Sequence, residues 1–417
     1  MPSIEKVLKV QLVMILCFTM PNPMMDIFFP SLHTVTTLVL YATTVYSVAY
    51  LMSKKYKYNS KIFLWYVVYF LIYSAIIYYY LTIGRLYPLS KMLGCPNNVS
   101  VFITNTLILL LFILQAPLYS RIKDFSFLVK AYIILNLPLV LFYIETIGVE
   151  EILFDESATD ISTLLLASVA SNSLLLAIIF KSSFSKSKLT NRIILLIVFA
   201  ATMYVWGSLA KRGAILWFFV TLAIYYIFKS KNTKTTILKI GIISVIVYIS
   251  LPLIINGLET VSPLLAERIE ATVVEGNTSG RMDEDGGFEI ATKQFYESPI
   301  TGSYFRIVTT NPLWQGMYPH NIILEVLITF GILGLIPLLC FIWKIFSNLR
   351  YSFCNNDKVE QVSIEKVLGI MFINTFFSMM TSGTILLNLS FWVNIAILLT
   401  INYKQNEKLL NNNTAQK

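Results

Sequence analysis

Charged residues are scarce in this sequence: Asp, Glu, Lys and Arg together make up 13% of its 417 residues. A typical soluble protein carries roughly 25% of these residue types, so a set of soluble domains is excluded. The chain also has only two histidines and four scattered cysteines, with no CxxC pair. Neither a disulfide framework nor a metal site is therefore predicted. Hydrophobic residues are plentiful instead, at 56%, and they fall in long runs.

These runs predict an all-α polytopic membrane protein. Several approach the ~20 residues that a helix needs to cross a hydrocarbon core, and lipid offers an open backbone no hydrogen-bond partner. Membrane barrels show alternating segments of ~10 residues instead. No small-x-small cleavage site follows the first run, so it is expected to remain as a span. We expect about twelve transmembrane helices, at 7–25, 31–52, 62–83, 98–118, 126–145, 161–180, 191–208, 213–229, 237–255, 320–346, 365–382 and 384–401.

Basic residues indicate the orientation of these spans. Short cytoplasmic loops of membrane proteins are rich in Lys and Arg, and such clusters follow spans two, six and eight, at 54–61, 181–192 and 229–234. The acidic run at 145–160 falls in a loop on the other side. This distribution predicts that both termini are cytoplasmic. The net charge of +9 then follows from topology, and no nucleic-acid partner is predicted.

One stretch between spans nine and ten is long and polar, and we expect it to form a loop on the outer face. Within it, Phe288, Ala291, Thr292 and Phe295 repeat at helical spacing, and the stripe ends before a proline. This pattern predicts a short amphipathic helix. The expected organisation is spans one to nine in 1–255, the outer loop in 256–319, spans ten to twelve in 320–401 and a cytoplasmic tail in 402–417.

Two basic residues lie where the topology disfavours positive charge. Lys211 and Arg212 occupy a tight turn at the outer ends of spans seven and eight. One interpretation is an arginine that reaches to lipid headgroups. The other is that Arg212, whose planar fork suits phosphate, binds an anion at the membrane surface. Arg281 in the outer loop is a further cation, which by itself is typical of a solvated charge.

A histidine and an acid mark the outer start of span ten. His320 precedes Asn321, and imidazole can accept a proton from a hydroxyl near neutral pH, although a histidine at a helix start can also be structural. Asn321 and Glu325 are i, i+4 neighbours. Glu325 lies one turn inside the membrane, where an acid is a functional hypothesis by default. The second histidine, His33, starts span two and either joins this site or lies at the interface.

In order and spacing, these elements resemble the O-antigen polymerase and O-antigen ligase superfamily. The turn at Lys211-Arg212-Gly213 is similar to the family's Ser-Arg-Gly turn, with Lys211 standing where the family often has serine. Tyr304 likewise replaces a glycine that follows the family's Pro-Ile-Thr-Gly element. The other matching segments are Ser279–Arg281, Phe288–Phe295, Ser298–Gly302, Pro319–Glu325 and Gly331–Leu335.

The resemblance implies glycan transfer from an undecaprenyl-diphosphate carrier at the periplasmic face of the bacterial inner membrane, without cofactor or metal. Donor and acceptor are lipid-linked oligosaccharides, and a chain-length regulator is a candidate partner. The implied site comprises a catalytic pair, a set of diphosphate-binding cations and a set of substrate-loop residues: His320 and Glu325; Arg212, Arg281 and Lys211; and Tyr304, Arg306 and Asn321.

Three functions fit this pattern. A polymerase, which extends a lipid-linked repeat unit, is favoured by a composition rich in Ile, Lys, Asn and Tyr that is typical of polysaccharide gene clusters. A ligase shares the site but transfers the finished polymer to lipid A–core. A lipid-linked oligosaccharide flippase also has about twelve spans, but it needs charges inside the spans to line a path, whereas the charges here gather at the outer face.

Overall fold

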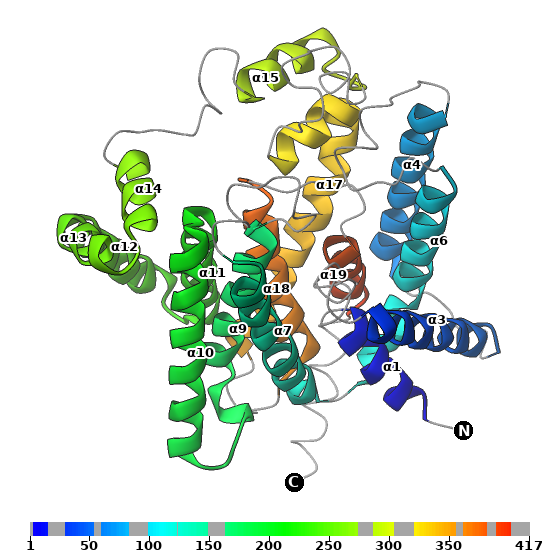
Figure 1. The fold of residues 1–417 in the computed structure, drawn as a ribbon. Helices are drawn as coiled ribbons and strands as arrows, with labels where there is room; N and C mark the ends of the chain where they lie inside the picture. The colour runs from blue at the N-terminus through cyan, green and yellow to red at the C-terminus, as the bar shows by residue number, and fades with distance from the viewer. Residues whose placement is uncertain are drawn as a thin grey trace.

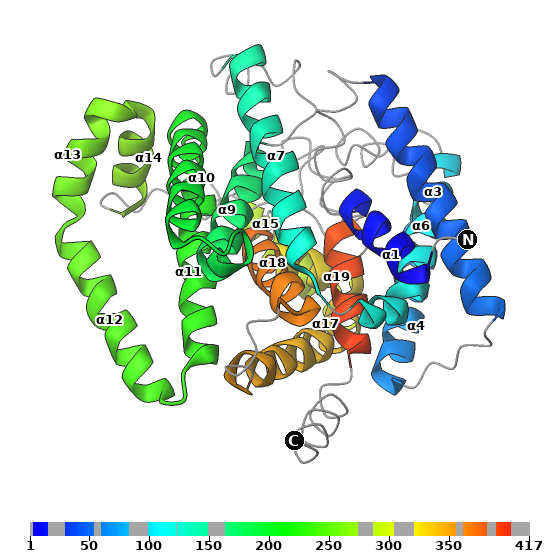
Figure 2. The ribbon, with the colours of Figure 1, turned by 90° about the horizontal axis from the view of Figure 1, so that it is seen from below.

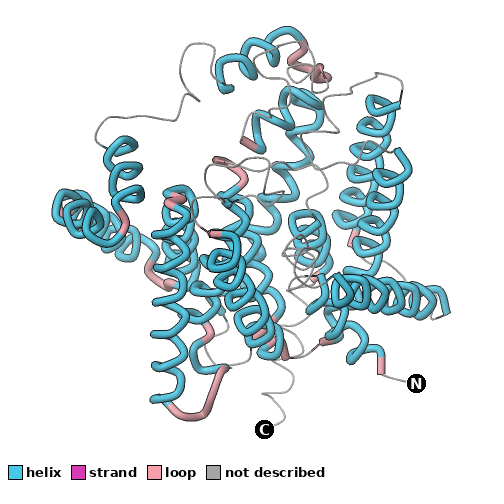
Figure 3. Tube along the Cα trace, viewed as in Figure 1, coloured by secondary structure: helices cyan, strands magenta, loops and turns pink. Residues whose placement is uncertain are grey.

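A computed structural model describes residues 3–15, 30–53, 60–82, 99–122, 124–148, 163–273, 287–303, 321–355, 362–381 and 389–401. Within these ranges all regular structure is helical (Figures 1 and 3). Two short 3-10 helices, η2 (Ala116–Arg121) and η3 (Lys181–Ser183), accompany the α-helices. The α-helices are α1 (Ile4–Val13), α3 (Pro30–Ser53), α4 (Lys61–Thr82), α6 (Val99–Gln115), α7 (Ser126–Ile147), α9 (Thr163–Ile179), α10 (Lys188–Leu209), α11 (Arg212–Lys229), α12 (Thr233–Ile249), α13 (Leu251–Val261), α14 (Pro263–Val273), α15 (Gly287–Glu297), α17 (Ile322–Asn355), α18 (Ile364–Ser378) and α19 (Leu389–Thr400).

Six helices of the described ranges are long and apolar enough to cross a membrane, and a seventh span results if α12 and α13 are counted as one bent span. Shorter apolar helices accompany them within α6–η2, α9 and α19. The protein is therefore an all-α membrane protein, and the number of twelve spans stays a prediction. The six are Thr34–Ser53, Lys61–Tyr79, Ser126–Ile147, Lys188–Leu209, Arg212–Lys229 and Ile322–Cys354.

The core lies around α18 and α19, which are buried on nearly every side. Trp392 of α19 is fully buried, and its ring lies 5.1 Å from that of Phe70 and 4.9 Å from that of Tyr73, between ring centres. The hydroxyl of Tyr66 donates a 2.7 Å hydrogen bond to the Trp392 carbonyl. Helices that are apolar all round belong in the interior of a bundle, and these ring contacts attach α19 to α4.

In contrast to the buried helices α18 and α19, α12 has no buried residue. Its large apolar side chains, from Ile237 to Ile249, are exposed, and Figure 2 shows the helix at the edge of the molecule. Lipid tails are as apolar as leucine, so a membrane accommodates this exposure where water would not. The outer faces of α3 and α10 carry similar exposed residues.

Neutral amides tie several helices together inside the bundle. The Gln11 amide donates to Gln115 at 2.7 Å and to Thr44 at 3.0 Å, which joins α1, α6 and α3. The Asn374 amide of α18 donates to Asn172 of α9 at 2.9 Å. Hydrogen bonds between spans contribute roughly 0.6 kcal/mol on average in a membrane, and they specify which helices are neighbours.

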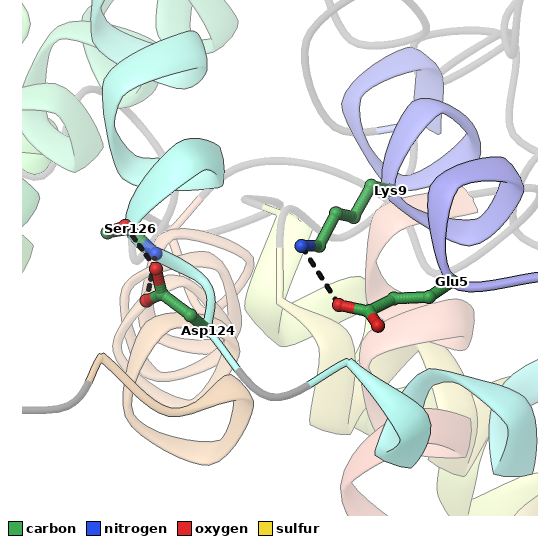
Figure 4. A network of polar contacts seen from close by, with 4 residues as sticks. All are labelled: Glu5, Lys9, Asp124 and Ser126. Atoms are coloured by element: carbon green, nitrogen blue, oxygen red, sulfur yellow. Dashed lines mark hydrogen bonds and ion pairs between the residues drawn. The ribbon is translucent and has the colours of Figure 1, made fainter. Parts of the chain in front are cut away.

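Polar contacts also mark the end of the bundle where α1 and α7 begin (Figure 4). Asp124 accepts hydrogen bonds from the backbone N–H of Ser126 at 3.0 Å and from its hydroxyl at 2.7 Å. It thereby satisfies an N–H group that the first turn of α7 leaves open. On α1, Glu5 and Lys9 form a 2.9 Å ion pair, and the Lys9 amine lies 5.4 Å from the ring centre of Phe127.

The structure differs from the sequence prediction around span nine. The sequence predicts one span over 237–255 followed by a loop with one helix, whereas α12 ends at Ile249 and bends by 56° into α13, and α14 follows. Pro252, in the first turn of α13, explains the break, because proline has no N–H and is tolerated only where a helix starts. The helix α15 occupies the stretch where the sequence predicts one, and it ends one residue before Ser298.

Candidate functional site

The predicted cationic turn joins α10 and α11 through two residues, Ala210 and Lys211. Ala210 has a left-handed backbone with φ of 46°, which costs a non-glycine residue about 1–2 kcal/mol. Arg212 begins α11 and is half-buried. A strained backbone that persists in a folded protein requires surrounding structure to hold it.

That surrounding structure is α14. A guanidinium nitrogen of Arg212 (Nη1) donates a 2.9 Å hydrogen bond to the Arg268 carbonyl, and Arg268 Nη1 donates in return to the Ala210 carbonyl at 3.4 Å. Nearby, the hydroxyl of Ser262 donates to the Gly207 carbonyl at 2.7 Å. Two arginines therefore meet at the turn. The sequence gives Arg268 no special signal, since it lies among Glu267 and Glu270 in a stretch that reads as a solvated charge run.

The start of α17 is held by Asn321. Its side-chain oxygen accepts the N–H groups of Ile323 at 3.0 Å and Leu324 at 3.1 Å, which caps the helix. Its amide nitrogen donates to the Met380 carbonyl at 3.1 Å, and the Ile322 N–H donates to the Met379 carbonyl at 3.0 Å. The Asn321 side chain thus joins the start of α17 to the segment that follows α18.

Glu325 is fully buried one turn further along α17. Its backbone N–H donates to the Asn321 carbonyl at 2.8 Å, and its carbonyl accepts the hydroxyl of Thr329. A carboxyl group inside the bundle is costly unless its neighbours compensate for lost hydration. Such residues in membrane spans usually serve function, so Glu325 stays a candidate.

The segment that follows α18 contacts both the start of α11 and the start of α17, where the predicted site residues of the described ranges lie. The indole N–H of Trp217, on the second turn of α11, donates a 2.8 Å hydrogen bond to the Thr381 hydroxyl. A Cβ atom on Gly213 would lie 3.4 Å from the same hydroxyl. Because Asn321 binds Met380, the segment Met379–Thr381 touches both the start of α11 and the start of α17. The sequence gave no reason to select this segment.

A further junction attaches α15 and the following turn to α17. The Ser303 N–H donates to the Ile328 carbonyl at 2.7 Å, the Ile332 N–H to Pro299 at 2.9 Å and the Leu333 N–H to Ile300 at 3.2 Å. In an uninterrupted helix, Ile332 would instead donate to Ile328. The segment 298–303, which we call the strap, therefore replaces the helix's own hydrogen bonds at this point.

Two glycines permit the strap to insert. Gly331 interrupts α17 with φ of 62° and ψ of −162°, and Gly302 in the strap has φ of 74°. A Cβ atom on Gly331 would lie 2.2 Å from the Ile300 carbonyl oxygen, and one on Gly302 would lie 2.5 Å from the Phe330 nitrogen. The sequence predicts an unbroken span here, because glycine is common in membrane helices. The two Gly-containing motifs of the family resemblance are thus direct neighbours.

Several predicted site residues lie outside the described ranges: His320, Arg281, Tyr304 and Arg306. His33 belongs to α3, but its side chain is not among those described. Of the predicted site, the described members Lys211, Arg212, Asn321 and Glu325 belong to the starts of α11 and α17.

Comparison with known proteins does not assign this sequence to a family. No protein-family profile matches the sequence, and no curated protein matches it significantly. The resemblance of the motifs to the O-antigen superfamily therefore stays a prediction.

Proposed function

We propose that this membrane protein is an O-antigen polymerase. It transfers glycan from an undecaprenyl-diphosphate carrier onto a lipid-linked repeat unit at the periplasmic face of the bacterial inner membrane. The proposal includes twelve spans with both termini in the cytoplasm. One observation supports it most: the first two turns of α11, which begins at Arg212, and the start of α17, directly after His320, both contact Met379–Thr381.

The reaction requires a cation and a base on the same side of the membrane. The acceptor hydroxyl attacks the anomeric carbon of the donor glycan while the bond from that carbon to the diphosphate oxygen breaks. The diphosphate leaves with the electron pair, and Arg212, Arg281 and Lys211 stabilise its charge through short ionic hydrogen bonds. His320 accepts the hydroxyl proton, with Glu325 in support. Attack opposite the leaving group inverts the anomeric centre.

The supporting geometry explains why the site would be rigid. Asn321 fixes the first turn of α17 to α18, and the strap fixes the same helix three turns later. The cross-bonds between Arg212 and Arg268 fix the turn. Catalytic groups held in place before the reaction lose little free energy when substrate binds.

A strain lacking this gene tests the proposal through its lipopolysaccharide ladder on a gel. We expect a single repeat unit on the core in place of the ladder, and restoration by the wild-type gene. His320→Ala, Arg281→Ala and Arg212→Gln should fail to restore it, because loss of a positioned base or of one charge-stabilising donor slows such reactions about 10²- to 10³-fold.

Arg192→Gln is the matched control, because Arg192 is an exposed arginine at the other end of α10. It should restore a normal ladder, and all variants should be compared at equal protein level in the membrane. Bare core with polymer left on the lipid carrier would instead identify the ligase. A normal ladder in the deletion strain would contradict both.

A further inference from the structure

The break at Gly331 divides α17 into two segments. The first, Ile322–Phe330, follows His320 and contains Glu325, and we call it the leading segment. Asn321 holds its start. Because the break weakens its connection to the rest of α17, the orientation of the leading segment depends on what holds its other end.

That other end is held from α15 through Ser303. The Ser303 N–H donates to the Ile328 carbonyl at 2.7 Å, and the Ser303 hydroxyl donates to the same carbonyl at 3.4 Å. The side-chain amide of Gln294 donates in turn to the Ser303 hydroxyl oxygen. Ile328 lies one helical turn after Glu325. A continuous chain of hydrogen bonds therefore runs from α15 to within one turn of the predicted catalytic acid.

Helix α15 packs against α17 by an apolar face (Figure 1). Ala291 is fully buried in this face, and Ile290 and Phe295 pack against the core. Gln294 lies in the same face and is only 6% exposed. A polar side chain at the centre of an apolar contact needs a reason, since an apolar residue of the same length would pack there without loss of hydration.

The oxygen of the Gln294 amide argues against a purely stabilising role. This Oε1 atom is buried, and within the part of the chain that the structure describes it has no hydrogen-bond partner. A buried acceptor without a donor lowers stability. Residues that break a rule of stable packing are expected at functional sites, so the bond from the Gln294 amide nitrogen to Ser303 is the feature that accounts for a glutamine here.

We propose that Gln294 is a positioning residue: through Ser303 it fixes the end of the leading segment, and thereby the orientation of Glu325 and of His320 before it. The inference rests on the proposed function, which gives these two residues their roles. It adds that the packing of α15 on α17 assembles the side of the site that carries the base. Gln294 acts on the reaction only through Ser303.

Gln294→Met tests this role, because methionine keeps the length of the side chain and removes both amide atoms. In reconstituted transfer we expect kcat to fall roughly tenfold to a hundredfold, as displacement of a catalytic group by up to about 1 Å does. The KM for the lipid-linked donor should stay unchanged, since the proposed diphosphate site at the start of α11 lies outside this chain of contacts. The Tm should stay equal or rise, because the unpaired oxygen is removed.

Amide hydrogen exchange measures the positioning without reference to activity. Exchange at the Ser303 N–H should accelerate roughly tenfold in Gln294→Met, as the loss of one supporting hydrogen bond allows. Exchange at the Leu324 N–H should not change, because Asn321 holds it at the other end of the leading segment.

Two further variants make the test specific. Ser303→Ala removes the acceptor of the Gln294 bond, so it should lower kcat to a similar degree, and the double variant should lower it no further, since both remove one contact. Thr292→Val is the matched control, because Thr292 is an exposed residue of the same helix whose hydroxyl donates to the Phe288 carbonyl within α15. It should keep the wild-type kcat, KM and exchange.

The possible outcomes separate the inference from the proposed function. Unchanged exchange at Ser303 in Gln294→Met overturns the inference, and so does a normal kcat. A lower Tm with a parallel loss of activity makes Gln294 a stabilising residue and also overturns it. Absence of transfer by the wild-type protein contradicts the proposed function; faster exchange at Ser303 in Gln294→Met would then still support the link from α15 to the leading segment, and unchanged exchange would overturn both.

Discussion

Replacement of Gly331 by alanine should open the junction between the strap and α17. The new Cβ would meet the Ile300 carbonyl oxygen at 2.2 Å and the Gly302 nitrogen at 2.6 Å, both of them backbone atoms that cannot rotate away. The backbone at φ of 62° and ψ of −162° is also nearly exclusive to glycine, and alanine there costs about 1–3 kcal/mol.

The expected loss of stability follows from the hydrogen bonds that the junction contains. Three backbone hydrogen bonds join the strap to α17, and each contributes about 1 kcal/mol net. Loss of all three, added to the backbone cost, destabilises the protein by roughly 4–6 kcal/mol. An unfolding entropy of about 2.1 cal/mol/K per residue converts this into a fall in Tm of roughly 5–7 °C for a chain of this length.

The assay is the thermal midpoint in detergent, followed by size-exclusion chromatography after heating, together with amide hydrogen exchange. Exchange at Ile332, Leu333 and Ser303 should accelerate in Gly331→Ala, because these three N–H groups donate across the junction. Gly302→Ala should act in the same direction, and the double variant should cost less than the sum, since both open one junction.

Gly241→Ala is the matched control, because Gly241 lies within α12 and meets no atom within 4 Å. Alanine is the better helix former, so its Tm should stay equal or rise slightly. An unchanged Tm and slow exchange in Gly331→Ala would refute the junction. An equal fall in Tm in Gly331→Ala and Gly241→Ala would show that the effect is not specific to the junction.

Three further predictions concern helix contacts. Asn321→Ala should lower stability by about 1 kcal/mol or more through the lost cap. Asn321→Asp, which keeps the capping oxygen but loses the donor to Met380, should retain only the capping part of it; equal Tm values for the two would contradict the capping role. Asn374→Leu should cost about 1–3 kcal/mol because the buried Asn172 oxygen loses its donor, and a wild-type Tm would argue against this hydrogen bond. Gly369→Ala should cost less than Gly331→Ala, since its nearest neighbours would be atoms of the Leu349 side chain, which can shift, and not backbone atoms; the reverse order of Tm values would count against the packing.

The helices of the bundle could be predicted from the sequence because local hydropathy decides them. The predicted span 126–145 corresponds to α7 at Ser126–Ile147, and 213–229 corresponds to α11 at Arg212–Lys229. Continuous apolar runs need a helix in lipid whatever their neighbours are. The class of the protein as all-α and membrane-bound follows from the same property.

Features that depend on contacts between distant segments could not be predicted. The break at Gly331 exists because the strap supplies replacement hydrogen bonds from about thirty residues away, and an isolated glycine in an apolar run carries no sign of this. In the sequence, Arg268 is one charge among several. Its contacts with the turn follow only from the packing of α14 against it. Charge placement in the sequence selects Lys211, Arg212 and Glu325, and spacing selects Asn321. The contact of the starts of α11 and α17 with Met379–Thr381 required the fold.

Transfer by the purified protein tests the central claim most directly. The protein would be reconstituted in liposomes with undecaprenyl-diphosphate-linked repeat units, and the lipid-linked products and released undecaprenyl diphosphate would be measured over time. The account predicts a ladder of polymers with one diphosphate lipid released per bond formed, absent in His320→Ala and Arg212→Gln and present in Arg192→Gln. Neither polymer nor released lipid from wild-type protein that is folded and correctly inserted would contradict it.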